Sequence, residues 1–166
     1  DSQIAAFSLG AGSLAYAPMP STEGVAAAVI SAGCIHDMQA LPEHYRAAKI
    51  PFMYDPGQAV PALLGADLKN GIEGATAVFA NDYEFGLILQ KTGWTEEEVV
   101  KHCRALVVTY GEGGSRLVTK EGSIDIPNVQ AQAADPTGAG DAYRAGFIAA
   151  FLKNASLEKC AKLGAA

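Results

Sequence analysis

A short glycine-rich segment that runs directly into a helix constrains this chain more than any other stretch. Asp-Pro-Thr-Gly-Ala-Gly-Asp occupies residues 135–141, and residues 142–152 predict a helix. Gly138 and Gly140 leave the backbone free to turn and keep side chains away from its N–H groups, while the positive end of the helix dipole faces the loop. Free N–H groups at a helix start suit a phosphate, so the segment is predicted to cradle an anion.

Asp141 places a carboxylate at the mouth of the same helix. Beside a bound phosphoryl group, such a carboxylate can take a proton from a hydroxyl, which indicates general-base chemistry. The structural alternative is a tight Gly-x-Gly turn followed by an Asp that only caps the helix or balances its dipole. The residues by themselves leave both interpretations open.

The run over residues 135–141, followed by Ala-Tyr-Arg-Ala-Gly, resembles the second signature of the PfkB, or ribokinase-like, family of carbohydrate and nucleoside kinases. In that family the final Asp is the catalytic base and the Gly-Ala-Gly backbone is the anion hole. The resemblance therefore implies a catalytic base at Asp141 and an anion hole at Gly138, Ala139 and Gly140. It also implies a nucleotide contact at Thr137.

An Asn-x-x-Glu motif follows a predicted strand at residues 76–80 and places Asn81 and Glu84 at the end of that strand. The spacing fits an Asn N-cap with an acidic first helical turn. In the PfkB family the same motif organises magnesium and phosphate, and the resemblance implies this role, through water, for Asn81 and Glu84.

A Gly-rich turn joins two further predicted strands, at residues 105–109 and 115–119, and on its own indicates a hairpin. In ribokinase-like kinases the matching Thr-x-Gly-x-x-Gly segment borders the ATP phosphates and ribose. The resemblance therefore implies nucleotide contacts at Thr109, Gly111 and Gly114.

Breaker-bounded apolar runs alternate with helical segments in the first half of the chain. Residues 25–31 predict a buried parallel strand, residues 41–48 a helix with Pro42 in its first turn, and residues 50–54 the next strand. This alternation predicts a doubly wound α/β sheet. With the resemblance, the expected fold is a ribokinase-like, three-layer, mostly parallel sheet, and residues 1–166 are expected to form a single partial domain without the N-terminal part and lid.

Two helix starts are also predicted after the middle of the chain. Thr95 and Glu98 have the spacing of a reciprocal capping box, and a last helix is expected near Ser156.

Asp55-Pro56-Gly57-Gln58 follows the strand at residues 50–54, at the sheet edge where open α/β proteins place ligands. Pro56 and Gly57 are turn formers, whereas Asp55 and Gln58 are candidate substrate contacts. This four-residue segment resembles the one found at this place in the bacterial adenosine-kinase-like branch of the family. Ribokinases and fructokinases usually carry Asp-x-Asn-x-Arg here, so a nucleoside acceptor is favoured over a sugar.

Charge and cysteine content limit the alternatives. The 18 acidic and 12 basic residues give a net charge of −6, which argues against a nucleic-acid partner. Cys34, Cys103 and Cys160 form no Cys-x-x-Cys pair and indicate reduced thiols in a cytoplasmic protein. No apolar run reaches the roughly 18 residues that a membrane helix requires, so no membrane segment is expected.

Residues 4–9 predict a short strand that leads into Gly10-x-Gly12-x-x-Ala15, a superficial dinucleotide-binding fingerprint. Pro18 and Pro20 would break the helix that such a fingerprint must open, so a Gly- and Pro-rich loop is expected instead.

The sequence thus predicts an ATP- and Mg²⁺-dependent kinase that phosphorylates the primary hydroxyl of a nucleoside, with adenosine favoured. A sugar kinase and an inactive nucleotide-binding fragment are the alternatives. The resemblance adds a monovalent cation as a further candidate cofactor and a homodimer as a candidate assembly. Arg144 stays open between a phosphate contact and a solvated helix residue.

Overall fold

A single six-stranded sheet organises the protein in the computed structural model, which describes residues 10–129 and 137–166. The strands lie in the order in which they occur in the sequence: β1 (Ala28–Ser31), β2 (Phe52–Asp55), β3 (Ala77–Asn81), β4 (Leu106–Thr109), β5 (Ser115–Thr119) and β6 (Gly122–Ile126). Strands β1 to β4 pair in parallel, and β5 and β6 extend the sheet by antiparallel pairing. The mostly parallel sheet is as predicted.

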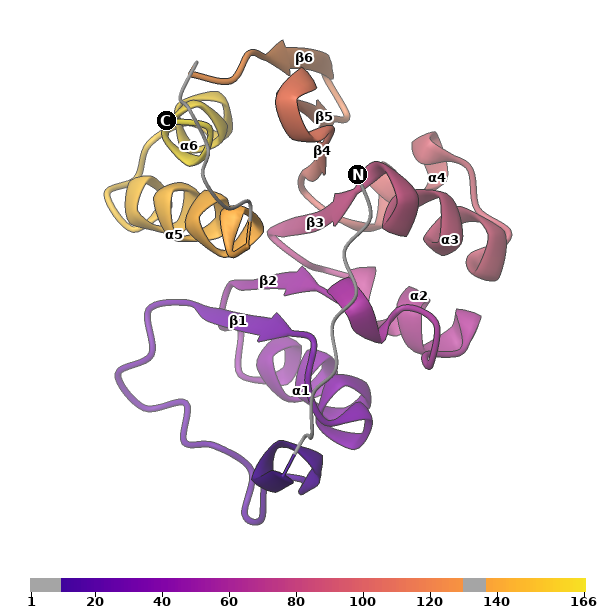
Figure 1. The fold of residues 1–166 in the computed structure, drawn as a ribbon. Coiled ribbons are helices and arrows are strands. Elements are labelled where there is room, and N and C mark those ends of the chain that lie inside the picture. The colour runs from indigo at the N-terminus through magenta and orange to yellow at the C-terminus, as the bar shows by residue number, and fades with distance from the viewer. Residues whose placement is uncertain (1–9, 130–136) are drawn as a thin grey trace.

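Helices cover both faces of this sheet (Figure 1). They are α1 (Ile35–Ala47), α2 (Gly65–Ile72), α3 (Asp82–Thr92), α4 (Glu96–His102), α5 (Ala139–Phe151) and α6 (Leu157–Gly164), with short 3₁₀ turns at Gly10–Ser13, Gly57–Ala59 and Gly111–Gly113. Helices α1 to α4 pack on one face, and α5 and α6 pack on the other. The predicted three-layer α/β arrangement is therefore confirmed.

Strand alternation divides the core into two apolar clusters. Tyr54 and Val78 point toward α1 to α4, whereas their neighbours Met53 and Phe79 point toward α5 and α6. Phe79 meets the buried ring of Phe147 edge to face, with ring centroids 5.1 Å apart. This contact seats α5 on the sheet and so fixes the helix that carries Asp141.

The first strand differs from the prediction for residues 25–31. It begins at Ala28, and its side chains alternate between buried and exposed, with Val29 43% exposed. Strand β1 is a parallel strand as predicted, but the expected burial on both sides is wrong because β1 lies at the sheet edge and only its Ile30 side joins the α1 to α4 cluster.

The first helix is longer than the predicted segment 41–48. Helix α1 begins at Ile35, so Pro42 lies inside it rather than in its first turn. A proline within a helix costs about 3 kcal/mol because it removes a hydrogen bond and crowds the preceding turn. Met38 and Leu41, which precede Pro42 in the helix, are buried in the core, and their packing offsets this cost.

The Gly10–Ser13 turn is followed by irregular backbone up to β1, and no α-helix begins within residues 10–27. A dinucleotide fingerprint there would need such a helix. The expected loop is therefore confirmed, whereas the strand predicted at residues 4–9 lies outside the described residues.

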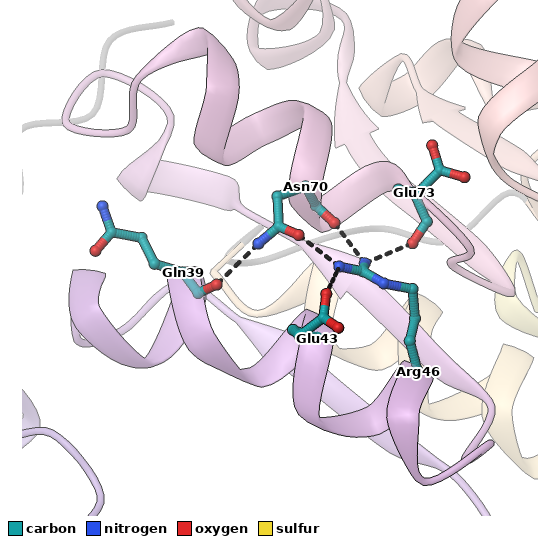
Figure 2. Close-up of polar contacts among 5 residues, drawn as sticks. All are labelled: Gln39, Glu43, Arg46, Asn70 and Glu73. Carbon is teal, nitrogen blue, oxygen red and sulfur yellow. Dashed lines mark hydrogen bonds and ion pairs between the residues drawn. The ribbon is translucent and has the colours of Figure 1, made fainter.

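An arginine on α1 joins that helix to the end of α2 (Figure 2). Arg46 donates through Nη1 to the carbonyl oxygens of Asn70 and Glu73, at 2.7 and 2.8 Å. Its Nη2 donates to Asn70 Oδ1 at 2.5 Å and to Glu43 at 3.1 Å, and Asn70 Nδ2 donates to the Gln39 carbonyl. The last carbonyls of a helix lack intrahelical partners, so these bonds cap α2 and fix its packing on α1.

The predicted capping box at the start of α4 is present. Thr95 Oγ1 accepts from the Glu98 N–H, and Glu98 Oε2 accepts from the Thr95 N–H at 2.7 Å. We expect Thr95→Ala to lower the free energy of unfolding by about 1 kcal/mol, measured by urea denaturation, because an orphan N–H loses its acceptor. Thr95→Ser keeps the hydroxyl and is the control; equal midpoints for the Ala variant and the wild type would contradict the prediction.

None of the helices in the two described ranges is both long and apolar enough to cross a membrane.

Candidate active site

A cavity of about 380 Å³ opens where the parallel strands end and α5 begins. Open α/β sheets bind ligands at this edge because the carboxyl ends of the strands and the loops that follow them converge there. The cavity is lined by Ser31, Ala32, Asp55, Gly57, Gln58, Phe79, Ala80, Asn81, Glu84, Thr109, Gly140, Asp141, Tyr143 and Arg144. The structure therefore brings together predicted substrate, magnesium, nucleotide and catalytic residues from the ends of β2, β3 and β4 and the starts of α3 and α5.

Gly138 forms the N-cap of α5 in a left-handed conformation, with φ of 82°. Only glycine adopts this conformation at no steric cost. Its carbonyl accepts the first helical hydrogen bond, from the Ala142 N–H at 2.9 Å. The N–H groups of the first turn of α5 lack intrahelical acceptors. Two of them belong to Ala139 and Gly140, which directly precede Asp141 in the sequence.

Arg144 lines the cavity and contacts three other polar residues of its lining. Its Nη1 donates to Asp55 Oδ2 at 2.5 Å and to Ser31 Oγ at 3.2 Å, while its Nη2 forms an ion pair with Asp141. Only 16% of the Arg144 side chain is exposed, so the solvated alternative for this residue is wrong. Arg144 instead connects the ends of β1 and β2 to the first turn of α5.

The two carboxylates on Arg144 have different surroundings. The Asp55 side chain is 13% exposed, whereas the Asp141 side chain is 75% exposed. Burial raises the pKa of Asp55 to about 6, with the negative charge of Glu84 adding to the rise and the Arg144 guanidinium opposing it. Asp55 is therefore the buried anchor of this cluster, and Asp141 is its solvent-facing end.

Asn81 and Glu84 form a capping box at the start of α3. Asn81 Oδ1 accepts from the Glu84 N–H at 2.7 Å, and Glu84 Oε2 accepts from the Asn81 N–H at 2.9 Å. The structural interpretation of this motif is thus confirmed, and both side chains also line the cavity.

The donor set suits a magnesium ion held through water better than one held directly. Within residues 10–129 and 137–166, no three His, Cys, Asp or Glu side chains gather closely enough to hold a metal ion. Mg²⁺ keeps several waters and needs only one or two protein carboxylates when substrate phosphates complete its shell. The Glu84 carboxylate at the cavity wall fits that requirement.

Some predicted site residues do not line the cavity. Gly111 and Gly114 lie in the β4–β5 turn, and Gly138 and Ala139 lie at the N-terminus of α5. Thr137 is in an exposed turn, and the preceding Asp135 and Pro136 lie outside the described residues. The nucleotide and anion-hole roles of these residues stay predictions.

Sequence reasoning missed the contributions of Ser31, Phe79 and Tyr143 to the cavity. Ser31 ends β1, so the rule that pointed to Asp55 applies to it as well. Tyr143 Oη is 2.9 Å from Ser115 Oγ, a pairing across 28 residues that no local pattern announces.

Comparison with known proteins gives the family directly. The model of the pfkB family carbohydrate kinases matches residues 23–166. The nucleoside kinase of Methanocaldococcus jannaschii is 40% identical over 114 residues, which cover 68% of this chain and 38% of that protein. The ATP-dependent ribose-1-phosphate kinase of Halopiger xanaduensis is 33% identical over 115 residues, or 68% of this chain and 36% of that protein.

A solved structure shows the same fold. The nucleoside kinase of Burkholderia thailandensis in complex with inosine superimposes with a TM-score of 0.83 and 34% identity over 87% of this chain and 48% of that one. This chain thus spans about half of that solved relative and less of the two curated ones. The family model covers most of the sequence, and the chain belongs to the PfkB family of carbohydrate kinases.

Proposed function

We propose that this chain forms the catalytic part of an ATP-dependent kinase that phosphorylates the primary hydroxyl of a nucleoside, with adenosine as the favoured acceptor. The observation that carries this proposal is the convergence of Asp55, Asn81, Glu84 and Asp141 on one cavity at the carboxyl edge of the sheet. The family supports phosphoryl transfer, and the nucleoside kinases among the relatives support the acceptor class.

Asp141 is the proposed general base. Its carboxylate takes the proton of the acceptor hydroxyl as the hydroxyl oxygen forms a bond to the γ-phosphorus of ATP. The bond from that phosphorus to the bridging oxygen breaks, and ADP leaves. The N–H groups of Gly138, Ala139 and Gly140 stabilise the negative charge that develops on the transferred group.

The remaining residues bind and orient. Asp55 and Gln58, on the β2 side of the cavity, are the proposed acceptor contacts. The donor nucleotide is assigned to Thr109, Gly111, Gly114 and Thr137. Mg²⁺, when bound, supplies charge neutralisation of the phosphates, and Asn81 and Glu84 hold it through water.

The cytoplasmic location, the monovalent cation and the homodimer belong to the same proposal. Cys34, Cys103 and Cys160 are free thiols, which supports a reducing compartment.

Release of ADP tests the proposed activity. ATP and Mg²⁺ are offered to the chain with adenosine, inosine or ribose in separate reactions. We expect nucleoside-dependent ADP release, fastest with adenosine. Faster release with ribose would favour the sugar kinase alternative, to which the ribose-1-phosphate kinase among the relatives lends support. Binding of ATP without release would favour the inactive nucleotide-binding alternative.

The magnesium role of Glu84 can be separated from its capping role. Glutamine also completes a capping box, so Glu84→Gln removes the negative charge and keeps the helix start. We expect the Mg²⁺ concentration for half-maximal activity to rise roughly 10-fold, as loss of an outer-shell partner typically produces.

Glu98→Gln is the matched control, because Glu98 holds the same position in the capping box of α4 and does not line the cavity. Its Mg²⁺ requirement should equal that of the wild type. An unchanged Mg²⁺ requirement in Glu84→Gln would limit Glu84 to a structural role.

A further inference from the structure

The Arg144 guanidinium contacts two groups of residues in the cavity, and these groups differ in how far they are buried. One end of its guanidinium is anchored by Asp55 and Ser31 from the ends of β2 and β1. The other end is paired with Asp141, one helical turn earlier on α5. Arginine suits this arrangement because its planar fork presents several donors in fixed geometry.

The anchored end is rigid because it is buried. The Arg144 and Asp55 side chains are 16% and 13% exposed, and both belong to elements packed in the core, α5 and β2. The Asp141 side chain is 75% exposed and would otherwise sample several rotamers. The ion pair to Arg144 removes that freedom in advance.

The ion pair engages Asp141 through Oδ1. The second oxygen, Oδ2, is then the atom assigned to proton transfer from the acceptor. A base held in the reactive geometry before substrate arrives avoids an ordering cost during the reaction, and a misplacement of about 1 Å can cost 10²-fold in rate.

We infer that Arg144 is a positioning residue: anchored on Asp55 and Ser31, it holds the Asp141 carboxylate in the orientation in which the carboxylate accepts the acceptor proton. This inference rests on the proposed function, because it gives Asp141 its role as base. In this inference Arg144 acts on the reaction through Asp141.

Removing Arg144 by itself would leave the Asp55 carboxylate buried without its cation, which is strongly destabilising. The test therefore compares the double variant Asp55→Asn with Arg144→Gln, which keeps the cluster polar without a buried charge, against Asp55→Asn alone. The single variant carries the loss of the Asp55 acceptor contact and keeps an amide oxygen that accepts from Arg144, so the difference between the two variants reports on Arg144. The single variant Arg144→Lys keeps a cation at this position, but its ammonium group cannot bind both carboxylates in the forked geometry of arginine.

Arg116→Gln is the control for the loss of an arginine ion pair. Arg116 pairs with Glu96 at 3.1 Å, has a half-buried side chain and does not line the active-site cavity. Acceptor-dependent ADP release is measured for the wild type and all variants, with kcat and the KM of each substrate determined separately.

We expect the double variant to lose about 10- to 100-fold in kcat relative to Asp55→Asn, with both KM values within about threefold of those of Asp55→Asn, since removal of Arg144 impairs orientation and not binding. Arg144→Lys should recover part of the loss, and Arg116→Gln should match the wild type.

Equal kcat values for the double variant and Asp55→Asn would overturn the inference while leaving the proposed function standing. A tenfold or larger rise in either KM of the double variant relative to Asp55→Asn would also overturn it, because Arg144 would then bind a ligand directly. If the wild type itself shows no acceptor-dependent turnover, the proposed function fails and the inference about Arg144 falls with it.

Discussion

Asp141→Asn is expected to lower kcat about 10³-fold, because asparagine has similar size but cannot accept the acceptor proton. The substitution should leave the fold intact, since the Asp141 side chain is 75% exposed and the amide oxygen can still accept from Arg144. Turnover under saturating ATP, Mg²⁺ and adenosine measures the loss, and urea denaturation checks the stability.

The matched control is Asp82→Asn. Asp82 also lies in the first turn of a helix, α3, is exposed, and does not line the cavity. It should keep wild-type kcat. Activity of Asp141→Asn within a few-fold of the wild type would remove Asp141 from its proposed role as base.

Gly146→Ala is expected to lower the free energy of unfolding by about 2–3 kcal/mol, the range typical of overpacking in a close contact. A Cβ atom at Gly146 would lie 2.4 Å from the Leu163 carbonyl oxygen and 3.0 Å from the Gly164 Cα. Both are backbone atoms of α6, so only a separation of α5 from α6 relieves the clash. Because α5 carries Asp141 and Arg144, kcat should fall together with stability.

Gly86→Ala is the control for the same substitution inside a helix. A Cβ atom at Gly86, in α3, meets nothing within 4 Å. Alanine should stabilise that helix by about 0.5–1 kcal/mol through its better helix propensity. An unfolding free energy for Gly146→Ala equal to or above that of the wild type would show that α5 and α6 are not packed as described.

The sheet could be predicted because each parallel strand carries its own apolar run between breakers. β2, β3 and β4 follow the runs at residues 50–54, 76–80 and 105–109 within two residues at each end. The helix starts at Thr95 and Ser156 could also be predicted from the local sequence, because an N-cap depends on its own side chain and the next few residues.

Helix α2 could not be predicted, because one of its residues is required by packing against another part of the chain and not by helix propensity. Gly71 lowers the helix propensity, yet a Cβ atom there would lie 2.2 Å from the Tyr54 ring. The start of α1 was misplaced for the opposite reason: Pro42 reads as a first-turn residue, and core packing overrides its local preference.

The candidate site was predictable where strand ends or signature motifs mark it, as for Asp55, Asn81 and Asp141. The role of Arg144 was not predictable, because its anchor Asp55 lies 89 residues away in sequence. The burial that raises the pKa of Asp55 likewise depends on the folded structure, in which Arg144 of α5 meets the end of β2, and no single segment specifies it.

The most direct test of the kinase assignment is to follow the product. The chain is incubated with ATP, Mg²⁺ and adenosine, and nucleoside monophosphate and ADP are quantified by mass spectrometry. We expect the two to form in equal amounts, and neither without acceptor. ADP formed without nucleoside monophosphate, or no ADP although ATP binds, would contradict the assignment of this chain as a nucleoside-phosphorylating enzyme.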